Sequence, residues 1–164
     1  MEVSWLDPRA LKRVRGWLRD WGPERIAWES RTKSRSTTWA LATLYSYRSD
    51  LIMTGSSAVE VLEPERLLLE GIWGNPVTLK YRAPRCDAYV GSGSTPETWA
   101  LRRRLLPGDL ARVRVNNLPI RWNRRHMPAA VVAADVLETS SDEDDREMAL
   151  EALTLLLHSW REAH

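Results

Sequence analysis

Apolar residues recur at helical spacing at both ends of the chain. Near the N-terminus they form one stripe, with basic residues on the opposite side. The stripe consists of Leu11, Val14, Trp17, Leu18 and Trp21. Gly22-Pro23 ends this helix, and a second short helix is expected to continue to about Ser30, with Trp28 facing inward. The pattern predicts two helices within residues 1–31, whose tryptophans belong to the core.

A further helix is predicted over residues 141–162. Ser140 and Glu143 match a capping box, and the acidic residues after it suit the positive end of a helix dipole. Apolar residues then fill most positions from Met148 to Trp160. So broad an apolar face predicts a helix covered on two sides, by the rest of the molecule or by a partner. We therefore expect a homo-oligomer or a protein partner to form through this helix.

Residues 38–137 contain short apolar stretches separated by turns, which is typical of a β-rich body. The clearest alternation runs from Val77 to Arg82. In the strand expected from Leu110 to Asn116, the valines share one face while Arg112 and Arg114 share the other. These segments predict half-buried strands of an antiparallel sheet.

Two further segments complete the predicted architecture. A short helix is expected at 96–106, because Ser94 and Glu97 match a capping box. The apolar run from Ala129 to Leu137 is predicted as a buried strand. Together the elements predict one α+β domain spanning residues 1–164. Its centre is a small antiparallel β-barrel or strongly curved sheet, flanked by the N- and C-terminal helices.

Composition adds an uneven distribution of charge to this picture. The chain has 164 residues, of which 43% are hydrophobic, enough for one ordinary core. The net charge is only +2, but basic residues cluster in 9–48 and 102–125, and acidic residues in 60–70 and 135–151. Such segregation influences partner choice more than the net charge does. The basic side of the first helix can bind phosphate or an acidic partner, or remain solvated.

The sequence indicates no catalytic or metal site. The single cysteine, Cys86, excludes an intrachain disulfide and a multi-cysteine zinc site. The three histidines do not have metal-ligand spacing, and no G-x-S-x-G motif is present. No apolar run approaches the roughly 20 residues that span a membrane. We therefore expect a cytoplasmic, non-enzymatic protein without a cofactor or a membrane contact.

The segment from residue 99 to residue 138 contains a turn, a basic strand, a basic loop and an apolar run. These are Leu106-Pro107-Gly108-Asp109, ARVRV, IRWNRRH and AAVVAADVLE. The segment resembles the second half of an OB-fold of the bacterial single-stranded-DNA-binding protein type. The resemblance covers about a quarter of the chain and implies an OB-like barrel. The terminal helices depart from the family pattern, as does the helical rather than disordered acidic end.

Arginines interleaved with aromatic rings suggest a surface for single-stranded DNA or RNA, because phosphates pair with the former and bases stack on the latter. The predicted binding residues are Tyr81, Arg82, Arg112, Arg114, Arg121, Trp122, Arg124 and Arg125. In this interpretation Trp122 lies on the surface, and the alternative places it in the core. A second functional interpretation is a structural or adaptor protein of a larger assembly, for example a phage- or complex-associated barrel. It would use the basic face and the C-terminal helix for protein contacts.

Overall fold

The computed structural model of the chain describes residues 7–32, 36–40, 51–55, 57–58, 86–91, 93–109, 111–116 and 125–164. Helices α1 (Pro8–Asp20) and α2 (Pro23–Thr32) confirm the two predicted N-terminal helices. Helix α7 (Glu143–Ala163) confirms the predicted C-terminal helix. Its N-cap is Asp142, whose carboxylate accepts a hydrogen bond from the Asp145 backbone N–H. The polar residue that caps α7 is therefore two positions later than the predicted capping box.

The described strands form one open, mixed sheet with the order β2-β3-β5-β1-β4. Their bounds are β1 Ser36–Ala40, β2 Leu51–Met53, β3 Cys86–Val90, β4 Leu106–Pro107 and β5 Ala111–Arg114. Strands β3 and β5 pair in parallel, and the other neighbouring pairs are antiparallel. The α+β class is confirmed, but the predicted antiparallel β-barrel or strongly curved OB-like sheet is wrong, because the sheet is open and contains a parallel pair. The predicted strand at residues 77–82 lies outside the described residues.

Two helices explain why the sheet stays open. Helix α5 (Pro96–Arg102) lies in the connection between β3 and β5, and a parallel pair requires such a crossover. The segment predicted as the last barrel strand is instead helix α6 (Ala129–Thr139). An apolar run of this length has no periodicity that separates a strand from a buried helix. Its four alanines favour the helix, and its valines pack equally well in either state.

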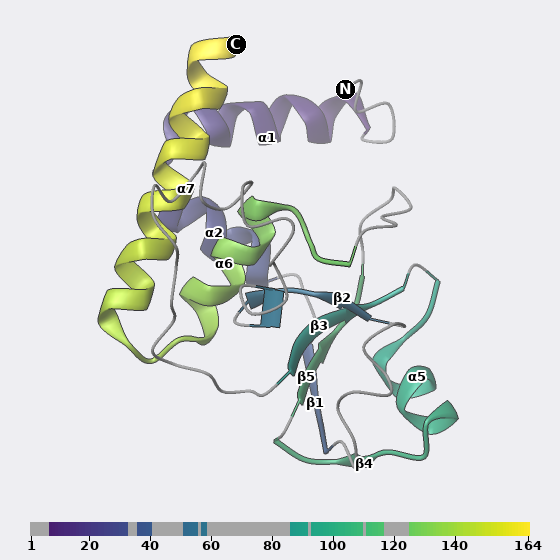
Figure 1. Cartoon of the computed structure of the whole chain (residues 1–164). Coiled ribbons are helices and arrows are strands. Elements are labelled where there is room, and N and C mark those ends of the chain that lie inside the picture. The colour runs from purple at the N-terminus through teal and green to yellow at the C-terminus, as the bar shows by residue number, and fades with distance from the viewer. Residues whose placement is uncertain are drawn as a thin grey trace.

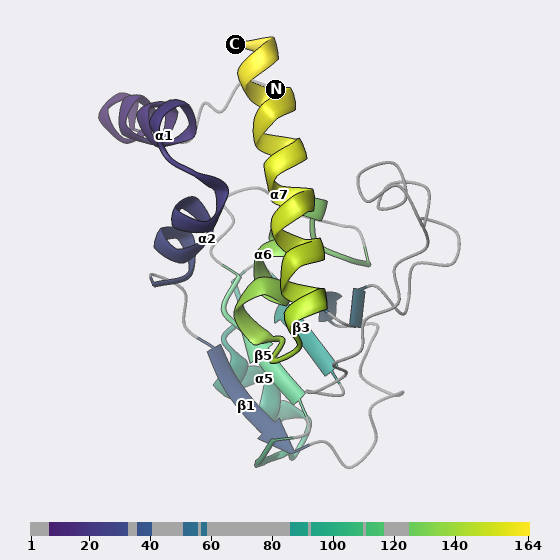
Figure 2. The same cartoon turned by 90° about the vertical axis from the view of Figure 1, so that its left-hand side faces the viewer.

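The helices cover both faces of the sheet. Helix α6 lies on one face and is backed by α7 and α2, whereas α5 lies on the opposite face (Figures 1 and 2). The main core cluster combines sheet residues with Trp99 and Ala100 of α5 and Val132 of α6. A second cluster joins Ala27 of α2 to residues of α6 and to Ala149 of α7. The sheet is therefore the middle layer of the described molecule.

Helix α7 is covered on two sides by its own chain. Its buried apolar residues include Ala149, Ala152 and Leu157, and it packs chiefly against α6 and also against α2. Leu155 is the large hydrophobic residue of α7 that remains exposed, at 48%. The broad apolar face from which we predicted an oligomer is thus covered in part by α6 and α2 of the same chain. None of the helices in the described stretches has the length and apolar composition needed to cross a membrane.

Candidate functional site

Three buried charged residues lie in segments that converge at the sheet. Asp87 lies in β3, Arg114 ends β5, and Asp135 lies in the middle of α6. The parallel register pairs Tyr89 with Arg114, so Asp87 and Tyr89 share the sheet face of Arg114. Helix α6 covers this face (Figure 1). Because a buried charge is costly unless it is paired, these residues are expected to contact one another.

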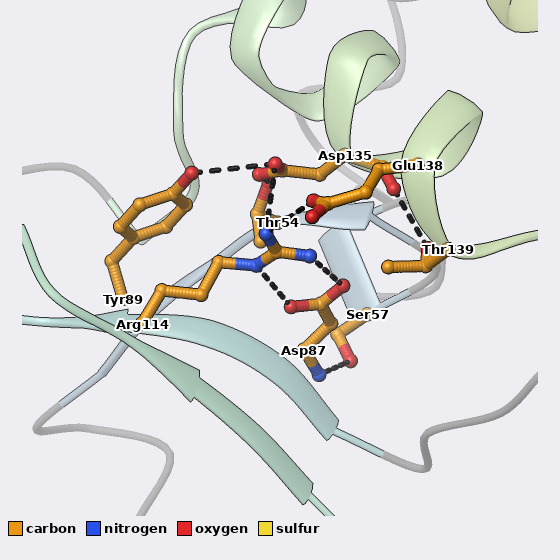
Figure 3. Close-up of polar contacts among 8 residues, drawn as sticks. All are labelled: Thr54, Ser57, Asp87, Tyr89, Arg114, Asp135, Glu138 and Thr139. Carbon is orange, nitrogen blue, oxygen red and sulfur yellow. Dashed lines mark hydrogen bonds and ion pairs between the residues drawn. The ribbon is translucent and has the colours of Figure 1, made fainter. Parts of the chain in front are cut away.

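The guanidinium of Arg114 binds the carboxylate of Asp87 through two hydrogen bonds (Figure 3). The Nε–Oδ1 distance is 2.8 Å and the Nη2–Oδ2 distance is 3.1 Å. Both side chains are only 1% exposed. A two-pronged contact of this kind fixes the planes of both groups as well as their separation. It joins neighbouring strands β3 and β5 on the face that meets α6.

The same guanidinium also reaches two carboxylates of α6. Its Nη1 atom lies 3.3 Å from Asp135 Oδ1 and 2.7 Å from Glu138 Oε2. Residues three positions apart lie on the same side of a helix, so Asp135 and Glu138 face the sheet together. The Glu138 side chain keeps 34% of its surface exposed. Arg114 therefore ties the helix layer to the sheet.

Three hydroxyl groups add hydrogen bonds around the buried carboxylates, two to Asp135 and one to the backbone of Asp87. Thr54 donates to Asp135 Oδ2 at 2.5 Å, and the Tyr89 hydroxyl lies 3.3 Å from Asp135 Oδ1. Ser57 Oγ accepts a hydrogen bond from the Asp87 backbone N–H at 2.8 Å. We call this set the Arg114 cluster. It consists of Thr54, Ser57, Asp87, Tyr89, Arg114, Asp135 and Glu138 (Figure 3).

Opposing influences act on the charge of Arg114. Burial alone would lower the pKa of its guanidinium, but the hydrogen bond and negative charge of Asp87 raise that pKa, as does the charge of Asp135. The net effect raises the pKa of Arg114 above its ordinary value, so the residue stays protonated at any pH at which the protein is handled. The cluster thus holds a permanent cation in an almost fully buried position.

Gly55 permits the close approach of the chain to Asp87. Its φ of +52° lies in the left-handed region, where a side chain would be strained. A Cβ at this position would also lie 2.8 Å from Asp87 Oδ2. The Thr54 backbone N–H donates to the Asp87 carbonyl at 3.0 Å, which draws the two segments together. This turn therefore requires glycine for both its backbone angle and the space.

The Arg114 cluster is built to hold layers together rather than to react. Arg114, Asp87 and Asp135 are buried and make the contacts described above, whereas the Glu138 carboxylate is partly exposed. Within the described stretches, no group of three or more histidine, cysteine, aspartate or glutamate residues is placed to hold a metal ion. The buried charges explain cohesion of the sheet and α6.

The sequence-predicted binding residues do not form one surface in the described part of the chain. Arg114 is buried in the cluster, Arg112 is half-buried on β5, and Arg125 is exposed. The other members lie outside the described residues, and they are Tyr81, Arg82, Arg121, Trp122 and Arg124. The burial of Arg114 removes one cation from the predicted surface. Arg114 is buried because α6 covers its face of the sheet. The alternation of residues in β5 does not show which face of the strand another element will cover.

Helix α1 carries a different basic surface. Five exposed cationic side chains lie on one side of it, and Asp20 is its one acidic residue, which gives the helix a formal charge of +4. The cations are Arg9, Lys12, Arg13, Arg15 and Arg19. No residue of α1 is buried, and the helix projects from the body (Figure 2). We call this side the basic face of α1.

Tryptophan rings line the other side of α1 and support its cations. The rings of Trp17 and Trp21 stack with centroids 4.8 Å apart. The guanidinium of Arg25 lies 3.9 Å from the Trp21 ring centroid, and that of Arg13 lies 5.6 Å from the Trp17 centroid. Trp17 and Trp21 are half-buried, but Trp28 is 70% exposed, so its predicted place in the core is wrong. Its helix, α2, instead buries Ala27.

Comparisons with models of protein families, with characterised proteins and with solved structures found no match to this chain. Functional inference therefore depends on the side chains themselves. Among the residues of the Arg114 cluster, the sequence pattern pointed only to Arg114, and it assigned that residue to a basic surface. The signal for Asp87 and Asp135 was a lone carboxylate in an apolar run, which requires a buried partner.

Proposed function

We propose that the protein binds nucleic acid without chemical reaction, through contacts between the basic face of α1 and phosphates. The observation that carries the proposal is the gathering of five exposed cations on one side of a projecting helix. Phosphate contacts by arginine and lysine supply most of the affinity in binding that does not depend on base sequence. Arginine is well suited to this role because its planar fork matches a phosphate group.

The stacked tryptophans favour backbone contact over base stacking at this helix. Trp17 and Trp21 lie against each other, and both also have an arginine over a ring, so their faces are occupied. A preference for single strands would need free rings. Whether Trp122 offers one stays a prediction, because residues 117–124 lie outside the described residues. The proposal is therefore phosphate recognition, with single-stranded DNA or RNA as the first ligand to test.

The proposal is tested by measuring the affinity for a labelled single-stranded oligonucleotide of mixed sequence. Fluorescence anisotropy gives this affinity at a low salt concentration and at a fourfold higher one. Five phosphate contacts imply about a 100-fold loss of affinity over that range, because the salt dependence of single strands scales with the number of contacts. The triple variant Lys12→Gln, Arg15→Gln and Arg19→Gln should reduce this loss to less than tenfold. Glutamine keeps helix propensity, so the melting temperature should not change.

A matched variant removes the same charge from a different surface. Arg102 and Arg104 are exposed and Arg103 between them is partly exposed, and we would replace the three together by glutamine. Binding and its salt dependence should then remain close to those of the natural protein. If this variant loses the salt dependence and the α1 variant does not, the proposed surface is wrong. No saturable binding by the natural protein at low salt would contradict the function itself.

The second candidate function is an adaptor in a larger assembly. The observation that favours it is the exposure of large apolar side chains on helices, Trp28 at 70% and Leu155 at 48%. Tryptophan is enriched where proteins meet, and its truncation there is often costly to binding. In this interpretation the basic face of α1 would dock on an acidic protein surface. Oligonucleotides would then bind weakly and with no dependence on Lys12, Arg15 and Arg19.

A further inference from the structure

A hollow of about 340 Å³ lies between the N-terminal helices and the pair formed by α6 and α7. All eleven residues that line it are apolar. Those that the argument uses are Leu18, Ala27, Ala130, Ala134, Leu157 and Trp160. We call this space the apolar hollow. Its position under α1 and α2 separates it from both the Arg114 cluster and the basic face of α1.

Small residues create the hollow where α2 crosses α6. Ala27 and Ala134 belong to the same cluster, and both line the space. Because neither side chain extends beyond a methyl group, the larger residues around them do not meet across the gap. Trp160 and Leu18 remain half-buried at its edge. An apolar surface of this kind gains free energy when an apolar group covers it.

One exposed cation, Arg161, lies at one edge of the hollow, beside the lining residues Leu18 and Trp160. Arg161 donates from Nε to the Leu18 carbonyl at 2.8 Å and from Nη2 to the Trp21 carbonyl at 2.7 Å. Arg161 follows Trp160, a lining residue, and Arg25 lies over the Trp21 ring. The guanidinium of Arg161 has five N–H groups, and these two bonds use only part of them. The edge is therefore suited to a carboxylate or another acidic group.

The opposite side of the hollow has different chemistry. A second hollow of about 260 Å³ shares Ala27 and Ala134 with the first, and its lining includes Glu24, Glu138 and Arg146. This lining has two carboxylates and one cation, so an acidic group meets a less favourable charge there than beside the apolar hollow, whose lining has no carboxylate. An elongated ligand with one acidic end would therefore place that end at Arg161. Its apolar part would extend towards Ala27 and Ala134.

We propose that the apolar hollow binds a single-chain amphiphile with an acidic head group, of the chemical class of a medium-chain fatty acid. The volume lies at the lower end of the roughly 300–1,000 Å³ that small-molecule sites occupy, which suits one alkyl chain better than a large cofactor. The alkyl chain fills the apolar lining, and the carboxylate binds at Arg161. This site does not depend on nucleic-acid binding.

Isothermal titration calorimetry with three ligands of equal chain length tests the proposal on the natural protein. The ligands are decanoate, decanol and decyltrimethylammonium, each below its micelle concentration. One decanoate should bind per chain, at least tenfold more tightly than decyltrimethylammonium, with decanol between them. Equal affinity for the anionic and cationic ligands would overturn the assignment of the head group. No saturable binding of decanoate would overturn the site, and would leave the hollow to a protein partner.

Variants locate the ligand within the molecule. Ala130 is exposed and lines the hollow, so Ala130→Leu places a larger side chain there without crowding the buried core. It should abolish decanoate binding, whereas Ala163→Leu at the exposed end of α7 should not. Arg161→Gln should weaken decanoate about tenfold and leave decanol unchanged. Unaltered decanoate binding by Ala130→Leu would overturn the location, and equal weakening of both ligands by Arg161→Gln would overturn the carboxylate contact.

Discussion

The two sides of α6 meet opposite environments. Towards the sheet, Asp135 and Glu138 enter the Arg114 cluster, where charges are buried and paired. Towards α2 and α7, Ala130 and Ala134 line an apolar hollow that is open to solvent. This is the reverse of the usual arrangement, in which apolar side chains are buried and charged side chains face solvent. Charges can be buried on one side of α6 because each is paired with an opposite charge. The apolar surface on the other side is open because no side chain of the described residues covers it.

The two regions also differ in rigidity and in the space that they leave for a ligand. The Arg114 cluster joins β3, β5, α6 and the turn at Thr54 through directional contacts that leave little room for change. The apolar hollow has no such contacts, and its alanines leave space. A ligand or a partner can enter the second region without disturbing the first. Three substitutions make this comparison quantitative.

The largest effect is expected at Arg114. Arg114→Met keeps a long side chain but leaves Asp87, Asp135 and Glu138 without their shared cation, which should lower the free energy of unfolding by about 3–5 kcal/mol. Urea denaturation measures this change. Arg102→Met on exposed α5 is the control and should stay within about 0.5 kcal/mol of the natural protein. Equal effects of the two variants would show that the cluster does not hold the layers together.

A smaller effect is expected beside the hollow. Leu157 is 7% exposed and lines the hollow, so Leu157→Ala should cost about 2 kcal/mol, the lower end for such a truncation, because the space it leaves opens to solvent. Leu155→Ala, two residues earlier and exposed, should change stability by less than about 0.5 kcal/mol. Thermal melts of both variants give the comparison. A loss near 5 kcal/mol at Leu157 would mean that the hollow is closed.

A third effect is expected at Gly55. Gly55→Ala should cost about 1–2 kcal/mol for the left-handed backbone, with a further loss from the contact of its Cβ with Asp87. Gly93→Ala is a matched control, because Gly93 also has positive φ but has nothing within 4 Å of the added Cβ. Chemical denaturation should show a greater loss at Gly55. Equal losses would mean that the Asp87 side chain moves away from the added methyl group without loss of stability.

Helix periodicity and chain breakers predicted α1, α2 and α7 from the sequence. They also predicted α5, but that helix ends at Arg102 rather than at residue 106, and its N-cap is Thr95 rather than Ser94. The turn at Gly22-Pro23 and the prolines at Pro8 and Pro96 are local signals, and local signals survive any tertiary arrangement. The alternation in β5 also correctly placed Arg112 and Arg114 on one side. These successes concern elements whose structure depends on near neighbours in the chain.

The sheet topology and the site depend on distant contacts, and there the sequence was insufficient. The alternation in β5 does not reveal which face another helix will cover, so Arg114 was assigned to a surface. The run from Ala129 to Leu137 was assigned to a strand because nothing local opposed it. Its isolated Asp135 was the available clue. A helix brings Asp135 and Glu138 to the same side, where one guanidinium serves both.

The long sequence separations within the Arg114 cluster have a consequence for the order of folding. Arg114 lies 24 residues from Glu138 and 27 from Asp87, and Thr54 lies 81 residues from Asp135. Such contacts require large loops to close, whereas α6 and α7 are adjacent in the chain and meet early at little entropic cost. We therefore expect the cluster to form after the rate-limiting step and to act chiefly by slowing unfolding. The buried charges would thus determine how long the native state persists rather than how fast it is reached.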